Sequence, residues 1–184
     1  MVSSIDVPMP GGGSTRYATL GSGTQGDYRF TDRVSATLDL TMSPFWGSAI
    51  TETGEIGARY RPAPLDANLR PFFDVRTAYM HMYDTFFFPG APPGGVGQQM
   101  VQEGRYSQGV GSVAGAGLEY SLTRSLALTT ELSAMRSRMT TYRLTNPTSV
   151  PDAAGSYWMT SLRYMFGLKY NPVRALKLVQ KATP

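Results

Sequence analysis

Apolar and polar residues alternate without interruption along Val34–Ser43, which reads VSATLDLTMS. Successive side chains of a β-strand point to opposite faces, so this segment predicts a strand with one apolar and one polar face. The apolar face carries Val34, Ala36, Leu38, Leu40 and Met42, and the polar face carries Ser35, Thr37, Asp39, Thr41 and Ser43. Segments with this two-faced pattern recur almost to the C-terminus, and together they predict an all-β chain.

The pattern predicts seven strands, or eight if the first of them is a small hairpin. The expected strands are Thr15–Phe30, Val34–Ser43, Ile50–Arg61, Arg70–Thr85, Gly109–Leu122, Leu126–Tyr142 and Ser156–Tyr170. Three glycines interrupt Thr15–Phe30, which leaves one long strand and a hairpin both open. If Thr15–Phe30 is one strand, the total is seven and one strand is missing, since outer-membrane barrels have even strand numbers. Either a start site chosen too late removed that partner, or the N-terminal arm or another subunit covers the exposed edge.

The expected connections alternate in length along the chain. Short ones lie near 31–33, 62–69 and 123–125, and longer ones near 44–49, 86–108 and 144–155. Short turns at one end and long loops at the other are typical of barrels that span an outer membrane. We therefore predict an up-and-down antiparallel β-barrel of about eight strands over residues 15–170, with an irregular arm (1–14) and a C-terminal tail (171–184).

Composition narrows the class of protein without contradicting this fold. The 184 residues suit one domain, and the chain has no cysteine, which excludes disulfides and thiolate metal sites. The net charge of +4 comes from scattered basic residues, so no nucleic-acid surface is predicted. No apolar run reaches the length of a membrane helix, and the mean hydropathy is −0.21, but barrel strands escape such a test.

A family resemblance rests on the hairpin Gly115–Leu132, which reads GAGLEYSLTRSLALTTEL. This block resembles the glycine-rich hairpin of small OmpA/OmpX-like outer-membrane β-barrel proteins, and Gly54–Tyr60 and Arg163–Tyr170 are similar in style. The resemblance covers about residues 15–170. It implies an eight-stranded barrel in the bacterial outer membrane, with a polar interior filled by side chains, periplasmic turns and extracellular loops.

The N-terminal segment Met1–Ser14 carries neither a basic region nor an apolar stretch, so no signal peptide is visible. Either the leader lies outside this sequence or the protein is not exported. The segment Asn171–Pro184 continues beyond the last expected strand, whereas family members of this size usually end there with an aromatic residue.

The polar strand faces would place nearly balanced charges inside a barrel. The acids are Asp27, Asp39, Glu55, Asp74, Asp84, Glu119 and Glu131, and the bases are Arg29, Arg59, Arg61, Arg76, Arg163 and Lys169. The charge network that we expect in the lumen consists of Asp39, Glu55, Arg59, Asp74, Arg76, Glu119, Glu131 and Arg163. A small barrel has little free interior, and buried charges must be paired, so these side chains predict a salt-bridged plug. A narrow ion or solute path is the alternative.

The apolar strand faces carry many aromatic residues, several of them near strand ends. We expect Tyr28, Phe73, Tyr79, Trp158, Tyr164 and Phe166 to face lipid. Tyrosine and tryptophan favour membrane interfaces, where the ring is apolar and the polar tip stays wet. In a soluble sandwich or lipocalin-like barrel the same residues would form the core, and the alternation alone does not separate the two arrangements.

The sequence offers little chemistry for catalysis. His81 is the only histidine and shares the apolar face of its strand, whereas Asp84 lies on the other face. We predict no enzymatic activity, no cofactor and no metal site. An outer-membrane lipid hydrolase or acyltransferase that uses His81 as its base is a minor alternative.

Two segments are candidates for contacts with other molecules. Phe86, Phe87 and Phe88 are three consecutive aromatic residues in the long loop 86–108, where they form either a contact site or a lid over the barrel. The tail 171–184 carries basic residues at helical spacing, and it is either a short amphipathic helix or a frayed end.

From these features we predict a non-enzymatic outer-membrane β-barrel with a structural or adhesion and contact role. Its expected partners are membrane lipid and proteins that bind loop 86–108 or tail 171–184, with no nucleic acid. The alternative is a water-soluble β-barrel or sandwich that serves as an accessory subunit of a membrane-associated assembly.

Overall fold

A computed structural model describes residues 1–8, 14–44, 50–63, 68–90, 99–123, 125–144 and 152–170. These residues form nine strands: β1 (Val2–Pro8), β2 (Ser14–Leu20), β3 (Ser22–Arg29), β4 (Val34–Pro44), β5 (Ile50–Tyr60), β6 (Leu69–Gly90), β7 (Gln99–Ser121), β8 (Leu126–Leu144) and β9 (Asp152–Tyr170). Within the described residues, no helix is long and apolar enough to cross a membrane.

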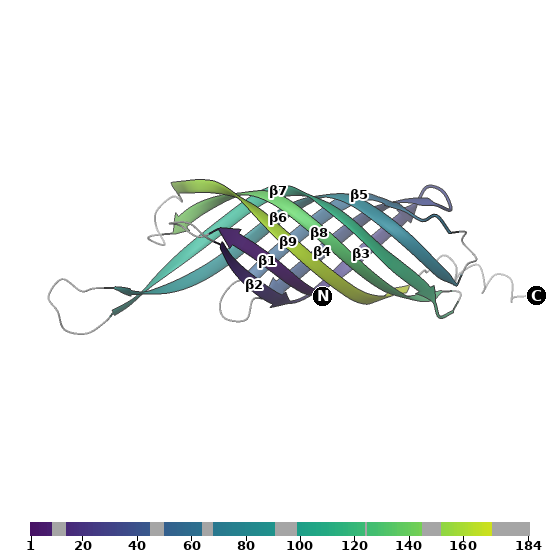
Figure 1. The fold of residues 1–184 in the computed structure, drawn as a ribbon, viewed down its shortest axis with the longest axis horizontal. Helices are drawn as coiled ribbons and strands as arrows, with labels where there is room; N and C mark the ends of the chain where they lie inside the picture. Colours follow the sequence, from purple (N-terminus) through teal and green to yellow (C-terminus); the bar gives the residue numbers. More distant parts are fainter. Residues whose placement is uncertain are drawn as a thin grey trace, which may run out of the picture.

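All nine strands belong to one curled antiparallel sheet with the order β2-β1-β9-β8-β7-β6-β5-β4-β3 (Figure 1). From β3 to β9, each strand pairs with its neighbour in sequence, which is the up-and-down arrangement. The outermost strands β2 and β3 are separated only by Gly21, so they are two halves of one long strand. The chain itself thus joins the two edges of the sheet. The prediction of an all-β, up-and-down antiparallel barrel of about eight strands is confirmed.

Two tight turns, between β3 and β4 and between β7 and β8, have the same hydrogen bonds. In each, two successive backbone N–H groups donate to the carbonyl of Val34 or Leu126 over 2.9–3.1 Å. The hydroxyl of Thr31 or Thr123 accepts hydrogen bonds from the N–H groups two and three residues later, over 3.0–3.3 Å. A threonine at the first turn position therefore stabilises both hairpins.

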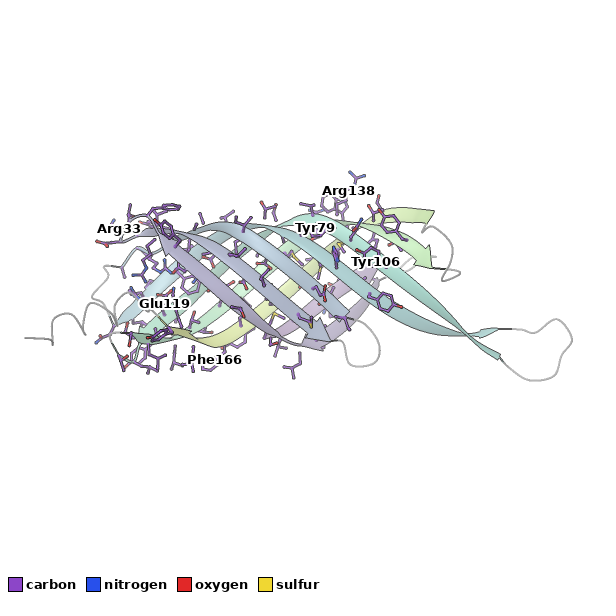
Figure 2. All side chains as sticks on the ribbon, turned by 180° about the vertical axis from the view of Figure 1, so that it is seen from behind. Arg33, Tyr79, Tyr106, Glu119, Arg138 and Phe166 are labelled. Atoms are coloured by element: carbon purple, nitrogen blue, oxygen red, sulfur yellow. The ribbon has the colours of Figure 1, made fainter. Side chains whose placement is uncertain are left out.

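Burial follows the predicted alternation, with the polar face of each strand inside the barrel. Asp39 and Arg163 are 1% and 7% exposed, whereas Leu38 and Phe166 are 52% and 65% exposed. Figure 2 shows the same arrangement, with Glu119 within the barrel and Phe166 on its outside. The half of the barrel nearer the tight turns is therefore polar inside and apolar outside, the reverse of a soluble protein.

The irregular arm predicted for residues 1–14 is wrong over Val2–Pro8, which forms β1. This strand pairs with β2 on one side and with β9 on the other. Its sequence VSSIDVP has no clear alternation, so only the hydrogen bonds to two neighbouring strands make it a strand. Residues 9–13 and the predicted tail 171–184 lie outside the described residues.

The long loop predicted for residues 86–108 is also wrong over most of its length. β6 runs to Gly90 and β7 begins at Gln99, and the two strands stay paired along this whole length. Their hairpin extends beyond the other strands at one end of the barrel (Figure 1). The side chains of Phe86, Phe87 and Phe88 are outside the description, so a contact site or lid there stays a prediction.

Candidate functional site: the charged interior of the barrel

Strand alternation brings charged side chains from seven strands into the lumen. All eight residues predicted for the charge network are buried, with at most 7% of each residue exposed. We call the following set the charge cluster: Asp27, Asp39, Glu55, Arg59, Arg61, Arg70, Asp74, Arg76, Glu119, Glu131, Arg163 and Lys169. It occupies the half of the barrel nearer the tight turns, and its ion pairs fall into three groups along the axis.

The group nearest the turns centres on Glu119 of β7. Its carboxylate accepts hydrogen bonds from Arg61 (2.9 Å), Arg70 (2.9 Å) and Lys169 (2.7 Å). Asp27 of β3 accepts two more, from Arg61 and Lys169, each over 2.5 Å. Arg70 and Glu119 lie opposite each other on neighbouring strands, whereas the other pairs of this group connect strands that are not neighbours.

The middle group contains two arginines and three acids. Arg59 holds Asp74 through two parallel hydrogen bonds of 2.7 Å, the fork geometry that guanidinium and carboxylate groups favour. Arg59 also donates to Glu131 over 3.1 Å. Arg76 donates to Asp39 over 2.7 Å and pairs with Glu131 from the other side. Glu131 of β8 thus connects the two arginines.

The third group crosses the lumen from β9 to β5. Arg163 binds Glu55 through both of its terminal nitrogens, over 2.6 and 2.8 Å. Arg76 lies 3.4 Å from the same carboxylate and links this group to the middle one. Because each acid meets at least one cation, the desolvation cost of burying these charges is offset by pairing.

Glycines on the inward face of β7 provide room for the long side chains. A Cβ atom on Gly115 would lie 3.2 Å from a carboxylate oxygen of Glu131. One on Gly117 would lie 2.3 Å from the ring of Phe72, which in turn stacks 3.8 Å below the Arg59 guanidinium. The G-x-G pattern noted in the sequence therefore has a packing role.

Sequence reasoning missed Arg70 and the second cluster in the lumen. Arg70 begins the expected strand Arg70–Thr85 but is absent from the predicted charge network, yet it is buried and donates to Glu119. Beyond the charge cluster, toward the long connections, lies a methionine-rich cluster of Ile5, Ala78, Met80, Met82, Val113, Met135, Met139 and Met159. The signal available was the run of methionines on the polar face of the β6 segment.

The space left between these clusters is small. A cavity of about 10 Å³ lies where they meet, lined by side chains that include Ser3, Met80 and Arg163. Such a volume holds about one water molecule. Arg29 is half-buried at the turn end, and the side chain of Asp84 is outside the description.

The six aromatic residues predicted to face lipid all point outward. Their exposed fractions range from 47% to 70%, and the residues are Tyr28, Phe73, Tyr79, Trp158, Tyr164 and Phe166. Arg136, also outward, lies 4.8 Å from the Trp158 ring. The outer wall is therefore apolar and aromatic, with an arginine stacked on tryptophan toward the long-connection end.

His81 lies next to two tyrosines. Its ring contacts Tyr79 and Tyr106 edge-on at centroid distances of 4.8 and 5.6 Å, and the Tyr106 hydroxyl is 3.3 Å from Nδ1. Glu52 of β5 lies opposite His81 in the strand register, and both residues line an open pocket together with Ser22. In the part of the chain that the structure describes, no group of three histidine, cysteine or acidic residues could hold a metal ion.

Comparison of the chain with protein-family models, curated proteins and solved structures finds no match.

Proposed function

We propose that this protein is a non-enzymatic β-barrel of the bacterial outer membrane, related to the small OmpA/OmpX-like proteins, with a structural or contact role. The observation that carries the proposal is the reversed burial of neighbouring residues. Leu38 is 52% exposed while Asp39 beside it is 1% exposed, and the same reversal recurs in the half of the barrel nearer the tight turns, as at Phe73 (55%) and Asp74 (2%). A continuous apolar outer surface drives aggregation in water, whereas it matches the hydrocarbon of a bilayer.

The height of the apolar band supports a membrane-spanning wall. Aromatic residues gather at two levels, represented on β6 by Phe73 near the tight turns and by Tyr83 toward the long connections. These two residues are ten positions apart. At about 3.3 Å per residue and a strand tilt of about 40°, that separation corresponds to about 25 Å along the axis, which is the apolar height of outer-membrane barrels.

The filled lumen supports a structural role over transport. Three groups of ion pairs cross the barrel interior, and the methionine-rich cluster fills the next level. The β6–β7 hairpin, which projects beyond the other strands, is the part best placed to contact other molecules (Figure 1). Protein partners at residues 86–108 and 171–184 are part of this proposal.

Spin labels can test which solvent meets the outer wall. The chain has no cysteine, so Leu38→Cys and Leu132→Cys each introduce a single labelling site. In lipid vesicles we expect both labels to be reached by oxygen and shielded from a water-soluble nickel complex, because oxygen concentrates in hydrocarbon. Arg33→Cys, in an exposed turn, is the matched control and should show the opposite preference.

A detergent-free, monodisperse protein whose Leu38 and Leu132 labels are open to the nickel complex would overturn the proposal. That result would favour the alternative of a water-soluble accessory subunit. The outward exposure of Leu38 and Phe166 counts against this alternative, which requires the apolar face to turn inward. The alternative of a lipid-modifying enzyme predicts that His81→Ala changes the lipid profile of the membrane, and we expect no change.

A further inference from the structure

Among the residues that the structure describes, the barrel wall contains a gap along part of its length. β1 pairs with β9 as far as Val2, which lies opposite Tyr164 on β9 and Leu20 on β2. Past this point, and within the described residues, β3 pairs only with β4, and Met165–Tyr170 of β9 pairs only with β8. We call the gap between the free edges of β3 and Met165–Tyr170 the seam. Figure 1 shows the N-terminus partway along the barrel, while β9 continues toward one end.

Residue exposure changes at the seam. Along β9, the inward residues are buried from Met159 to Arg163 and half-buried from Met165 onward. Along β3, the residues Asp27 and Arg29 are half-buried as well, although the Asp27 side chain itself is only 6% exposed. On β4, which has partners on both sides, the inward side chains are all buried. Residues that line the lumen are thus well covered only where both neighbouring strands are present.

The seam has the width of a single strand. β1 occupies one strand position between β2 and β9, and β2 continues into β3 through Gly21. The same position therefore continues between β3 and the end of β9. Lys169 and Asp27 reach each other across it on the inner side, with a nitrogen–oxygen distance of 2.5 Å. This pair holds the two edges in place without closing the ladder of backbone hydrogen bonds.

We propose that the seam is a binding slot for one extended polypeptide strand, and that this strand is a segment joined to Met1 and running in line with β1. Met1 already forms the first rung at the mouth of the slot, since its nitrogen donates to the Gly21 carbonyl over 3.0 Å. The Gly21 N–H donates back to the Met1 carbonyl over 2.9 Å. A strand joined at this point enters in register with both edges and needs no loop to reach them.

A separate peptide or a second copy of the chain fits the slot less well. Its end would meet Met1 inside the wall, where two chain termini would face each other without a peptide bond. The slot does not depend on a membrane, because unpaired strand edges template aggregation in water and are still less tolerated in lipid. The inference therefore stands or falls separately from the proposed function.

The walls of the slot define the strand that fits it. β3 offers eight residues to pair with, so a segment of about that length covers the longer edge. Val2 faces outward and Met1 faces the lumen, so the residue directly before Met1 would face outward. Apolar residues are required at that position and every second one before it, beside Tyr28 and Phe166. The intervening positions lie beside charged residues of the lumen and require polar side chains.

The test extends the chain by eight residues of alternating valine and threonine ahead of Met1. In the first variant valine occupies the outward positions. The matched control has the same composition with the order shifted by one residue, which reverses the two faces. Both are folded in detergent micelles and compared with the 184-residue chain by hydrogen exchange of backbone amides. The amides of β7 and β8, which have partners on both sides, report that the barrel has folded.

We expect the first variant to slow exchange about tenfold or more within both Ser22–Arg29 and Met165–Tyr170. The shifted control should leave both segments as fast as in the 184-residue chain. A four-residue extension in the correct phase should protect Ser22–Gln25 and leave the rest of β3 unprotected. This graded result would show that the strand enters in the register of β1.

Three results would overturn the proposal. Unchanged exchange at both edges, in a variant whose β7 and β8 amides are protected, would mean that no strand enters. Equal protection from a free peptide of the same sequence would mean that the strand need not be joined to Met1. If the amides of both edges are protected in the unextended chain and the protein is dimeric, a second copy of the chain fills the slot. In each case the membrane proposal would still hold if the spin labels at Leu38→Cys and Leu132→Cys are exposed to lipid.

Discussion

At the scale of single residues, the stability of the barrel interior depends on buried charges that each need an oppositely charged partner. Arg76 shows this most clearly, because it contacts Asp39, Glu55 and Glu131 from the middle of the charge cluster. It is 2% exposed, so water cannot replace a missing cation there. A buried ion pair adds little net stability, but breaking one leaves an uncompensated charge, which is strongly unfavourable.

Replacing Arg76 with glutamine should therefore destabilise the barrel by about 3–5 kcal/mol. The amide can hydrogen-bond one carboxylate but cannot neutralise any of the three. Arg33→Gln, which changes an exposed arginine in the turn after β3, should alter the free energy of unfolding by less than about 0.5 kcal/mol. Urea titration followed by gel mobility and circular dichroism measures both. Similar losses for the two variants would contradict a paired interior.

A second residue-scale prediction concerns the room beside Phe72. Gly117→Ala should cost about 1–3 kcal/mol, because the added methyl group would lie 2.2 Å from the backbone oxygen of Thr130 and 2.3 Å from the Phe72 ring, so both must shift. Gly26→Ala is the matched control, since its nearest neighbours would be atoms of Leu38 at 3.8 and 4.0 Å. The same urea titration compares them. An unchanged midpoint for Gly117→Ala would show that the ring can move freely.

At the scale of elements, the two tight turns set the register of their hairpins. The β3–β4 and β7–β8 turns share one hydrogen-bond pattern, and each begins with a threonine, although the residues that follow differ. The register on either side brings Val34 opposite Tyr60 and Leu126 opposite Tyr170. A slip of one residue would exchange the apolar and polar faces, so the turns protect the placement of the charge cluster.

Removing the threonine hydroxyl should weaken each hairpin. Thr31→Ala and Thr123→Ala should each lower the free energy of unfolding by about 0.5–1.5 kcal/mol, because two backbone N–H groups lose their acceptor. Thr31→Ser and Thr123→Ser retain the oxygen and should stay close to the parent chain. Equal destabilisation by serine and alanine would mean that the methyl group, rather than the hydroxyl, matters in these turns.

Much of the element structure could be predicted from the sequence, and the misses have a common cause. Val34–Ser43 and Ser156–Tyr170 were predicted within a few residues, because their alternation is uninterrupted. Val2–Pro8 and the outer half of the β6–β7 hairpin were missed, because neither alternates clearly. β1 pairs with β9, which is distant in sequence, and the outer part of the hairpin is held by the pairing of β6 with β7. Neither pairing requires the side chains to alternate in polarity.

At the scale of the whole molecule, the question is whether the lumen conducts. Side chains from β5, β6, β7, β8 and β9 meet at the centre, and the remaining cavity described above has room for about one water molecule. Ion pairs and packed methionines occupy the lumen at these levels among the described residues. The whole molecule is thus suited to holding a shape in the membrane and presenting its projecting hairpin.

We expect no stepwise current when the protein is inserted in a planar lipid bilayer. The chain carrying the eight-residue extension should be used, so that ions crossing at the seam are not counted as conduction through the lumen. Insertion is checked by the heat-dependent shift in gel mobility that folded barrels show. Regular current steps of constant size would contradict the filled interior and restore the alternative of a narrow ion or solute path.

The sequence by itself determined which residues share a strand face, because side-chain alternation is a local property of an extended backbone. Leu38 and Asp39 could be assigned to opposite faces from their positions alone. Only the tertiary structure decided which face is inside, that Val2–Pro8 is a strand, and that Arg70 joins Glu119. These features depend on the direction in which the sheet curls and on contacts between residues far apart in the chain. The alternation of apolar and polar side chains along a single strand is the same whether water or lipid surrounds the barrel.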